Sequence, residues 1–286
     1  MKASVLSHSW IAITLLLLAG CNKQSDLPSH ANNTTQVRLV NSMDICKYKD
    51  KDCVLPSQVF SDIYGSQAGI NSIGNYSVIP QQAALSIFST IKFDDGNDSY
   101  GIFLTQANTL TNEGVENCHT CAPLLGIGVY QYHNRWKLFS KDFKVAKIGS
   151  WGSILGYAKD PSDVNVVPIG NEKFLITLKT TDGGQGYYSD YLSIIQVNPV
   201  GVNQYSSQPI EFLGTIETAT SDCGSRISKG EDWISTVSIN ATEDHPSVTV
   251  TKNFRKNCTS EIVPGNQIVL NYKYNGLTKS YELNSK

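Results

Sequence analysis

IVLNYKYNGLTKSYEL, at residues 268–283, is the clearest strand pattern in the chain. Ile268, Leu270, Tyr272 and Tyr274 alternate with Val269, Asn271 and Lys273, which is the two-residue period of a half-buried β-strand. Asn275-Gly276 follows and predicts a type I′ turn, because both residues tolerate positive φ. Tyr281 and Leu283 should then return on the apolar face, so this stretch predicts a β-hairpin.

Similar patterns occur upstream of this hairpin. Runs rich in β-branched and aromatic residues predict strands at 84–93, 100–106, 124–132, 173–180 and 187–197. The segment Pro56–Tyr64, with Ser57 near its start and Gly65 beyond its end, predicts a short helix. We therefore expect a predominantly antiparallel all-β fold, either a large β-sandwich or a propeller-like meander of short strands. One or two short helices near the N-terminus are the most that this pattern allows.

The N-terminal segment has the parts of an export signal. Lys2 supplies a positive start, Trp10–Leu18 an apolar core, and Ala19-Gly20 a small-residue cleavage context. The apolar run is about half of the roughly 20 residues that a membrane-spanning helix needs. Leu17–Cys21 (LLAGC) resembles the lipobox of bacterial lipoproteins. This resemblance implies cleavage before Cys21, a diacylglyceryl group on its thiol and an acylated amino group, with palmitate as a constituent.

The resemblance also implies a domain plan. Residues 1–20 would be the lipoprotein signal peptide, and residues 21–36 the lipidated cysteine with a polar tether. Residues 37–286 would form one disulfide-stapled β domain. In Gram-negative lipoproteins an Asp after the cysteine favours inner-membrane retention, and this chain has Asn22. We therefore expect a lipid-anchored cell-envelope protein of the outer membrane, with the membrane as its first partner.

Charge argues against nucleic acid as a partner. The chain has 23 Lys and Arg against 25 Asp and Glu, and no block of basic residues stands out. Binding to phosphate backbones requires a concentrated basic face.

Six cysteines remain besides Cys21, and an even number in an exported chain predicts a disulfide framework. Six cysteines allow 15 pairings. Pairing each cysteine with its neighbour gives the following bonds: Cys46–Cys53, Cys118–Cys121 and Cys223–Cys258.

Cys118-His119-Thr120-Cys121 has three interpretations: a structural disulfide, a redox-active pair or part of a metal site. The first is favoured, because Ala122-Pro123 leads into a strand and not into the helix that a thioredoxin-like C-x-x-C requires. Haem attachment requires a histidine where this chain has Ala122. The wider segment Cys118–Gly152, with C-H-x-C-x-P followed by G-x-W-G, is similar to stretches of uncharacterised exported bacterial proteins.

Catalytic and metal-binding patterns are few. Outside the signal and tether the candidate bases are His119, His133 and His245, and neither G-x-S-x-G nor H-E-x-x-H occurs. The acidic cluster 94–98 lacks EF-hand spacing. We therefore predict no enzymatic activity, no metal and no cofactor. The segment 182–186 (DGGQG) predicts a turn whose glycines allow a ligand to approach the backbone closely.

Aromatic residues crowd the middle of the chain. They either fill a β core or, where exposed, form a platform that binds protein or glycan. The candidate binding residues are Tyr130, Tyr132, Trp136, Trp151, Tyr187 and Tyr188. The leading hypothesis is a non-enzymatic binding module for an envelope protein or glycan. The alternatives are an inhibitor or immunity-type protein acting on a toxin or lytic enzyme, and a thiol–disulfide exchange protein using Cys118 and Cys121.

Overall fold

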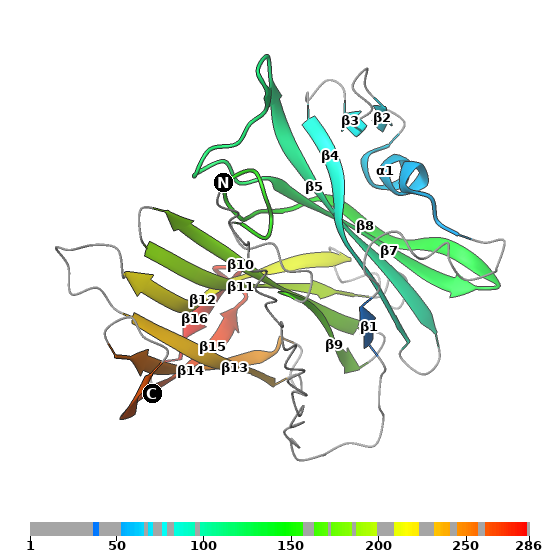
Figure 1. Cartoon of the computed structure of the whole chain (residues 1–286). Helices are drawn as coiled ribbons and strands as arrows, with labels where there is room; N and C mark the ends of the chain where they lie inside the picture. The colour runs from blue at the N-terminus through cyan, green and yellow to red at the C-terminus, as the bar shows by residue number, and fades with distance from the viewer. Residues whose placement is uncertain are drawn as a thin grey trace, which may run out of the picture. The chain divides into compact units, whose positions relative to one another are not determined.

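In the computed structural model, antiparallel strands make up most of the residues that the structure describes (Figure 1). The structure describes residues 37–39, 53–65, 68–70, 76–78, 83–94, 98–156, 163–170, 173–184, 187–198, 209–222, 232–240, 245–256 and 261–284. Within these ranges, no helix has both the length and the apolar composition needed to cross a lipid bilayer. The predicted signal peptide, Cys21 and the tether lie outside them.

The described part of the chain forms two eight-stranded sheets. The first contains β1 (Val37–Leu39), β2 (Ala68–Ile70), β3 (Tyr76–Val78), β4 (Ala83–Asp94), β5 (Ser99–Thr111), β6 (Gly114–Val115), β7 (Leu124–His133) and β8 (Arg135–Lys147). The second contains β9 (Val164–Gly170), β10 (Lys173–Gly184), β11 (Tyr187–Val197), β12 (Ile210–Asp222), β13 (Asp232–Asn240), β14 (Ser247–Arg255), β15 (Ile262–Asn275) and β16 (Ser280–Leu283). The helix α1 (Pro56–Tyr64) has the bounds that the sequence predicts.

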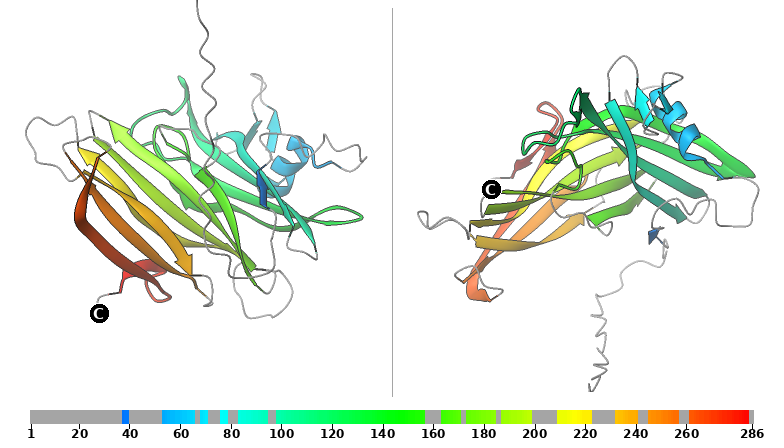
Figure 2. Two further views of the ribbon diagram at one scale, coloured as in Figure 1. Left: turned by 60° about the horizontal axis from the view of Figure 1, so that its bottom comes forward. Right: turned by 45° about the horizontal axis from the view of Figure 1, so that its top comes forward.

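Most strands pair with the strand that precedes or follows them in the chain. The first sheet has the order β2-β3-β4-β5-β7-β8, with β1 on β4 and β6 on β5. The second runs from β9 to β16 in chain order, which Figure 2 shows as a continuous change from green to red. The all-β antiparallel prediction is confirmed, and two packed sheets correspond to the sandwich alternative, not to the four-stranded blades of a propeller.

The two sheets share one hydrophobic core. In the first sheet, residues two apart point to it because side chains alternate along a strand. The second sheet contributes from β9, β10, β11 and β12 in the same way. The buried set includes Ile91, Phe93, Tyr100, Ile102, Leu104, Leu125, Ile127, Val129, Val164, Val166, Phe174, Ile176, Leu178, Ile195, Val197 and Ile210.

Helix α1 covers the opposite face of the first sheet. Its apolar side, with Val59 and Ile63 buried, packs against Phe103 and Tyr130. Glycines on β7 allow this close approach, since a Cβ at Gly126 would lie 2.5 Å from the Thr105 hydroxyl and 2.6 Å from that of Tyr64.

The second sheet curls so that β16 lies against β12. Tyr281 packs close to Gly214, which has φ +125, and the Tyr274 hydroxyl donates a hydrogen bond to Glu211. This curl encloses a second core on the other face of the sheet. Its members include Leu175, Ile194, Leu213, Ile216, Val248, Val250, Leu270, Tyr272, Tyr274 and Tyr281.

The C-terminal hairpin is confirmed, but its predicted turn is wrong. Asn275 pairs with Ser280, so four residues connect the strands in place of a two-residue type I′ turn. The Asn275 side chain accepts a hydrogen bond from the Leu277 backbone N–H, 2.9 Å away. An asparagine that bonds its own backbone two residues on builds a different turn. The predicted alternation also fails at Ile268, which is 44% exposed.

Candidate functional site

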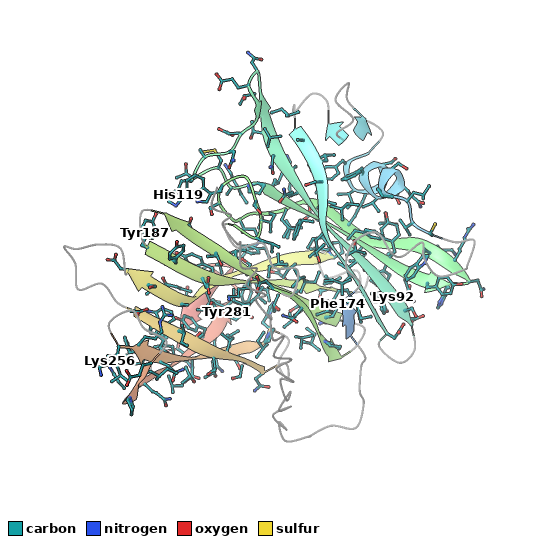
Figure 3. The ribbon with its side chains drawn as sticks, viewed as in Figure 1. Lys92, His119, Phe174, Tyr187, Lys256 and Tyr281 are labelled. Atoms are coloured by element: carbon teal, nitrogen blue, oxygen red, sulfur yellow. A yellow bond between two sulfur atoms is a disulfide. The ribbon has the colours of Figure 1, made fainter. Side chains whose placement is uncertain are left out.

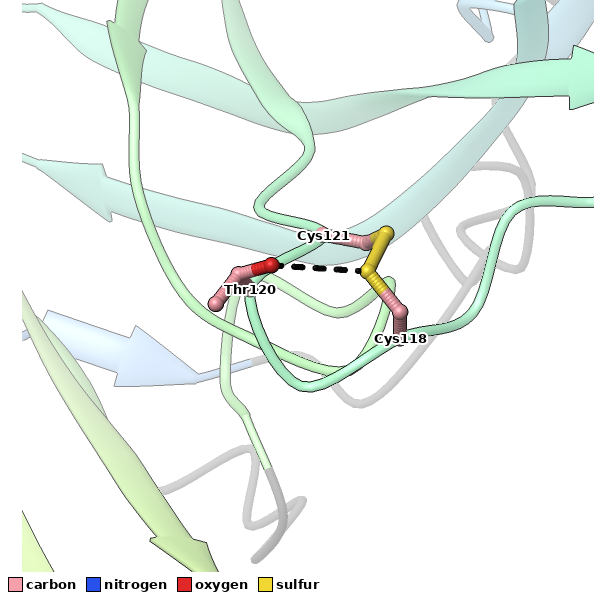
Figure 4. Close-up of a disulfide and its surroundings, with 3 residues drawn as sticks. All are labelled: Cys118, Thr120 and Cys121. Carbon is pink, nitrogen blue, oxygen red and sulfur yellow. Dashed lines mark hydrogen bonds between the residues drawn. A yellow bond between two sulfur atoms is a disulfide. The ribbon is translucent and has the colours of Figure 1, made fainter.

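The predicted Cys118–Cys121 disulfide is present in the connection between β6 and β7. Its Sγ atoms lie 1.99 Å apart, and the backbone N–H of Cys121 donates to the carbonyl of Cys118. The hydroxyl oxygen of Thr120 lies 3.6 Å from Sγ of Cys118 (Figure 4). The bond closes a tight four-residue loop around His119.

The other predicted pairings remain predictions. Cys53 has no disulfide partner among the described residues, and its predicted partner Cys46 lies outside them. Cys223 and Cys258 also lie outside them.

A second loop, which follows β8, is attached to the disulfide loop. The Gly152 N–H donates to the carbonyl of Cys121 at 2.8 Å, and the Asn108 side chain donates to the carbonyl of Gly152 at 2.7 Å. The loop requires glycine at position 149, because φ there is +88 and a Cβ would lie 2.1 Å from a backbone oxygen. These bonds hold Trp151 at the tip of the loop.

The end of the β10–β11 hairpin completes the site from the second sheet. The indole N–H of Trp151 donates to the carbonyl of Gly183 at 3.0 Å. Gly183 has no room for a side chain, because a Cβ there would lie 2.5 Å from the Tyr188 ring. The contacts therefore bring together three segments that the sequence motifs identify. These segments are 118–121, 149–152 and 182–186.

His119 contacts the end of the β10–β11 hairpin, and Figure 3 shows it near Tyr187. Its Nε2 atom is 2.9 Å from Oδ1 of Asp182 and 3.2 Å from the hydroxyl of Tyr187. Its ring is 5.3 Å from that of Trp151 and 6.1 Å from that of Tyr187, centroid to centroid. We call His119, Trp151, Asp182 and Tyr187 the His119 cluster.

The aromatic rings of this cluster are accessible to solvent. Trp151 and Tyr187 are each 38% exposed. The side chains of His119 and Asp182 are exposed to a similar extent. These two rings, an imidazole and a carboxylate form one surface that offers both apolar ring faces and polar atoms. Tyr188, the sixth candidate aromatic residue, follows Tyr187 on β11, so its side chain points to the opposite face of the strand.

The remaining candidate aromatic residues lie elsewhere. Tyr130 is fully buried under α1, and its hydroxyl donates to Asp62 at 2.8 Å. Burial, followed by this hydrogen bond and the Asp62 charge, raises the pKa of Tyr130. Tyr130 is therefore a core residue and not part of a surface platform. Tyr132 and Trp136 contact each other at 5.2 Å, with Lys92 beside the Trp136 ring.

A metal could not be held by the cysteines as they stand. Ligand atoms of Glu116, Cys118 and Cys121 lie within 4.8 Å of one another. Zinc binds cysteine as thiolate, however, and both sulfurs are joined in the disulfide.

The His119 contacts also differ from those of a nucleophilic triad. In a triad the carboxylate binds Nδ1 of the histidine and the nucleophile binds Nε2. Here Asp182 and the Tyr187 hydroxyl both approach Nε2. The arrangement therefore suits a fixed contact surface better than a proton relay.

Sequence reasoning singles out His119 only as a candidate base and as part of C-H-x-C, and Asp182 only as a turn residue. No local signal could join them, because one belongs to a connection in the first sheet and the other to β10 of the second. No family model matches the chain, and neither curated proteins nor solved structures give a match.

Proposed function

We propose that this protein is a lipid-anchored binding module of the bacterial cell envelope, which contacts an envelope protein or glycan through the His119 cluster. The observation that carries this proposal is the grouping of two partly exposed rings, Trp151 and Tyr187, around the ring of His119. Isolated exposed apolar residues are common, whereas grouped aromatic rings are typical of binding surfaces.

The cluster is held in place before any partner arrives. The disulfide, the Gly152–Cys121 hydrogen bond and the Trp151–Gly183 hydrogen bond fix the two loops against the hairpin. A fixed surface loses little conformational entropy on binding, and aromatic side chains have few rotatable bonds to immobilise. Preorganisation therefore favours a role in recognition.

The polar groups of the cluster suit the same role. His119 and Asp182 supply hydrogen-bonding atoms beside the rings. Ring faces next to such atoms match a sugar, which has apolar C–H faces and hydroxyl edges, and they also match a protein surface.

The envelope location rests on the resemblance of Leu17–Cys21 to a lipobox. Its test is fractionation of cells that express the chain or its Cys21→Ser variant. The unsubstituted chain is expected in the membrane fraction with incorporated palmitate. The variant should lose both properties, and a variant that still carried palmitate would contradict the assignment.

The binding role is tested with two probes. In the first, soluble peptidoglycan fragments are added to the protein and its tryptophan fluorescence is measured. In the second, an envelope extract is passed over the immobilised protein. Trp151→Ala should lose at least one of these interactions, while Trp136→Ala, on the α1 side of the first sheet, should keep it. Equal behaviour of the two variants would contradict the proposal. Capture of one lytic or toxin-like enzyme would favour the inhibitor alternative.

A further inference from the structure

We propose that the Cys118–Cys121 disulfide is a redox-sensitive clamp on the His119 cluster. Reduction of this bond would release His119 and Trp151 from the β10–β11 hairpin and weaken binding at the surface they form. The effect on binding rests on the proposed function, whereas the release itself does not.

The disulfide closes the short loop that carries His119. The residue lies between the two bonded cysteines, so the disulfide restricts the backbone that carries its ring. That ring reaches Asp182 and Tyr187 from the second sheet. Breaking the disulfide therefore removes the restraint on His119, the residue that contacts Asp182 and Tyr187 of the hairpin.

The same loop supports Trp151. The carbonyl of Cys121 accepts the Gly152 N–H, and the indole of Trp151 binds the carbonyl of Gly183. A movement of the Cys121 backbone therefore alters the hydrogen bond to Gly152, the residue that follows Trp151.

The disulfide is accessible to a reductant in solution. Cys118 is exposed and Cys121 half-buried, so Cys118 is the more accessible of the two to an attacking thiolate. Both sit in a surface connection and not in the core between the sheets.

The reaction is a thiol–disulfide exchange with a dithiol as co-reactant. One thiolate of the dithiol attacks Sγ of Cys118, the Cys118–Cys121 bond breaks, and Cys121 leaves as a thiolate that takes up a proton. The second thiol of the dithiol, once deprotonated, attacks the mixed disulfide and releases Cys118. Two electrons pass to the protein, which gains two thiols, and the dithiol becomes a disulfide.

The consequence of reduction is local. Closing a loop of only four residues contributes about 2 kcal/mol to global stability in the chain-entropy model, which is less than a longer loop would contribute. The core between the sheets contains neither cysteine. Reduction should therefore loosen the His119 cluster and leave the two sheets folded.

Hydrogen exchange tests this directly on the purified full chain. The oxidised protein is compared with the Cys118→Ser/Cys121→Ser variant, which lacks this disulfide and keeps the other cysteines. The amides of Gly152 and Cys121 should exchange roughly tenfold faster in the variant, as expected for local opening. Amides in the middle of β7, such as that of Ile127, should be unchanged.

A second measurement does not depend on the variant. The unsubstituted chain is treated with dithiothreitol, alkylation identifies the molecules with free Cys118, and exchange at Gly152 is followed in them. Unchanged exchange at Gly152 in reduced protein would overturn the clamp, even if Trp151→Ala abolishes binding. Faster exchange supports the clamp, and it does so independently of whether a binding partner is found.

Discussion

His119 and Asp182 connect the two sheets at the surface, with Nε2 of the histidine 2.9 Å from Oδ1 of the aspartate. His119 comes from the connection between β6 and β7, and Asp182 lies on β10. Below them the sheets share a buried core, so this contact adds a polar link at the edge of an apolar interface.

Removing this link should affect binding more than stability. Both side chains are more than one third exposed, and exposed ion pairs contribute about 0–1 kcal/mol. Asp182→Asn should therefore change the free energy of unfolding in urea by less than about 1 kcal/mol while weakening partner capture. His133→Ala, which removes the His133–Asp98 pair, serves as a control that should leave capture intact.

The close approach of α1 to β7 predicts a strong effect at Gly126. A Cβ there would collide with the Tyr64 and Thr105 hydroxyls, which lie 2.8 Å apart in a hydrogen bond. Gly126→Ala should lower the free energy of unfolding by about 1–3 kcal/mol, as overpacking does. Gly276→Ala is the matched control, because a Cβ at that position meets nothing within 4 Å. Equal stability of the two variants would contradict this packing.

Phe174 tests the packing between the sheets. Its ring, labelled in Figure 3, lies 4.9 Å from that of Phe93 and 5.9 Å from that of Tyr100, both in the first sheet. Phe174→Ala should cost about 3–5 kcal/mol in the free energy of unfolding, because it leaves a cavity. Val269→Ala, at a site 57% exposed, should cost less than about 0.5 kcal/mol. A small loss at Phe174 would argue against a shared core.

Alkaline pH should destabilise the fold through buried tyrosines. Burial raises the pKa of Tyr64 to about 12, against a smaller lowering by its hydrogen bond with Thr105. Burial, then the hydrogen bond with Glu211 and its charge, raises the pKa of Tyr274 to about 12. An unfolded tyrosine ionises near pH 10, so the folded state binds more protons above that pH. This part of the stability is complete below about pH 10 and is lost as the pH rises to about 12.

Urea midpoints measured across that range provide the test. The midpoint of the unsubstituted protein should fall steeply above about pH 10, and Tyr64→Phe/Tyr274→Phe should show a shallower fall. A double variant with an unchanged slope would refute the assignment.

Local sequence patterns predicted local structure well. The strand at Tyr187–Val197 and the helix at Pro56–Tyr64 have the predicted bounds, since runs of β-branched and aromatic residues and flanking Pro and Gly are local signals. The turn after Asn275 was not predicted, because Asn-Gly suits both a type I′ turn and the side-chain-bonded turn that forms.

The candidate site was predictable only in parts. The Cys118–Cys121 bond follows from short spacing, but its contact with the β10–β11 hairpin depends on how two sheets pack. Tyr130 shows the same limit, since the aromatic pattern does not reveal that α1 covers this ring.

The central claim is that the His119 cluster is the binding surface, and a photo-crosslinker tests it most directly. The crosslinkable residue is placed at Tyr187, which is 38% exposed in the cluster, or at Val269, which is exposed on β15. Both proteins are irradiated in intact cells. We expect a specific crosslinked envelope component from position 187 that is lost when Trp151→Ala is added, and none from position 269. Crosslinking from position 269 alone, or crosslinking at 187 that is insensitive to Trp151→Ala, would contradict the claim.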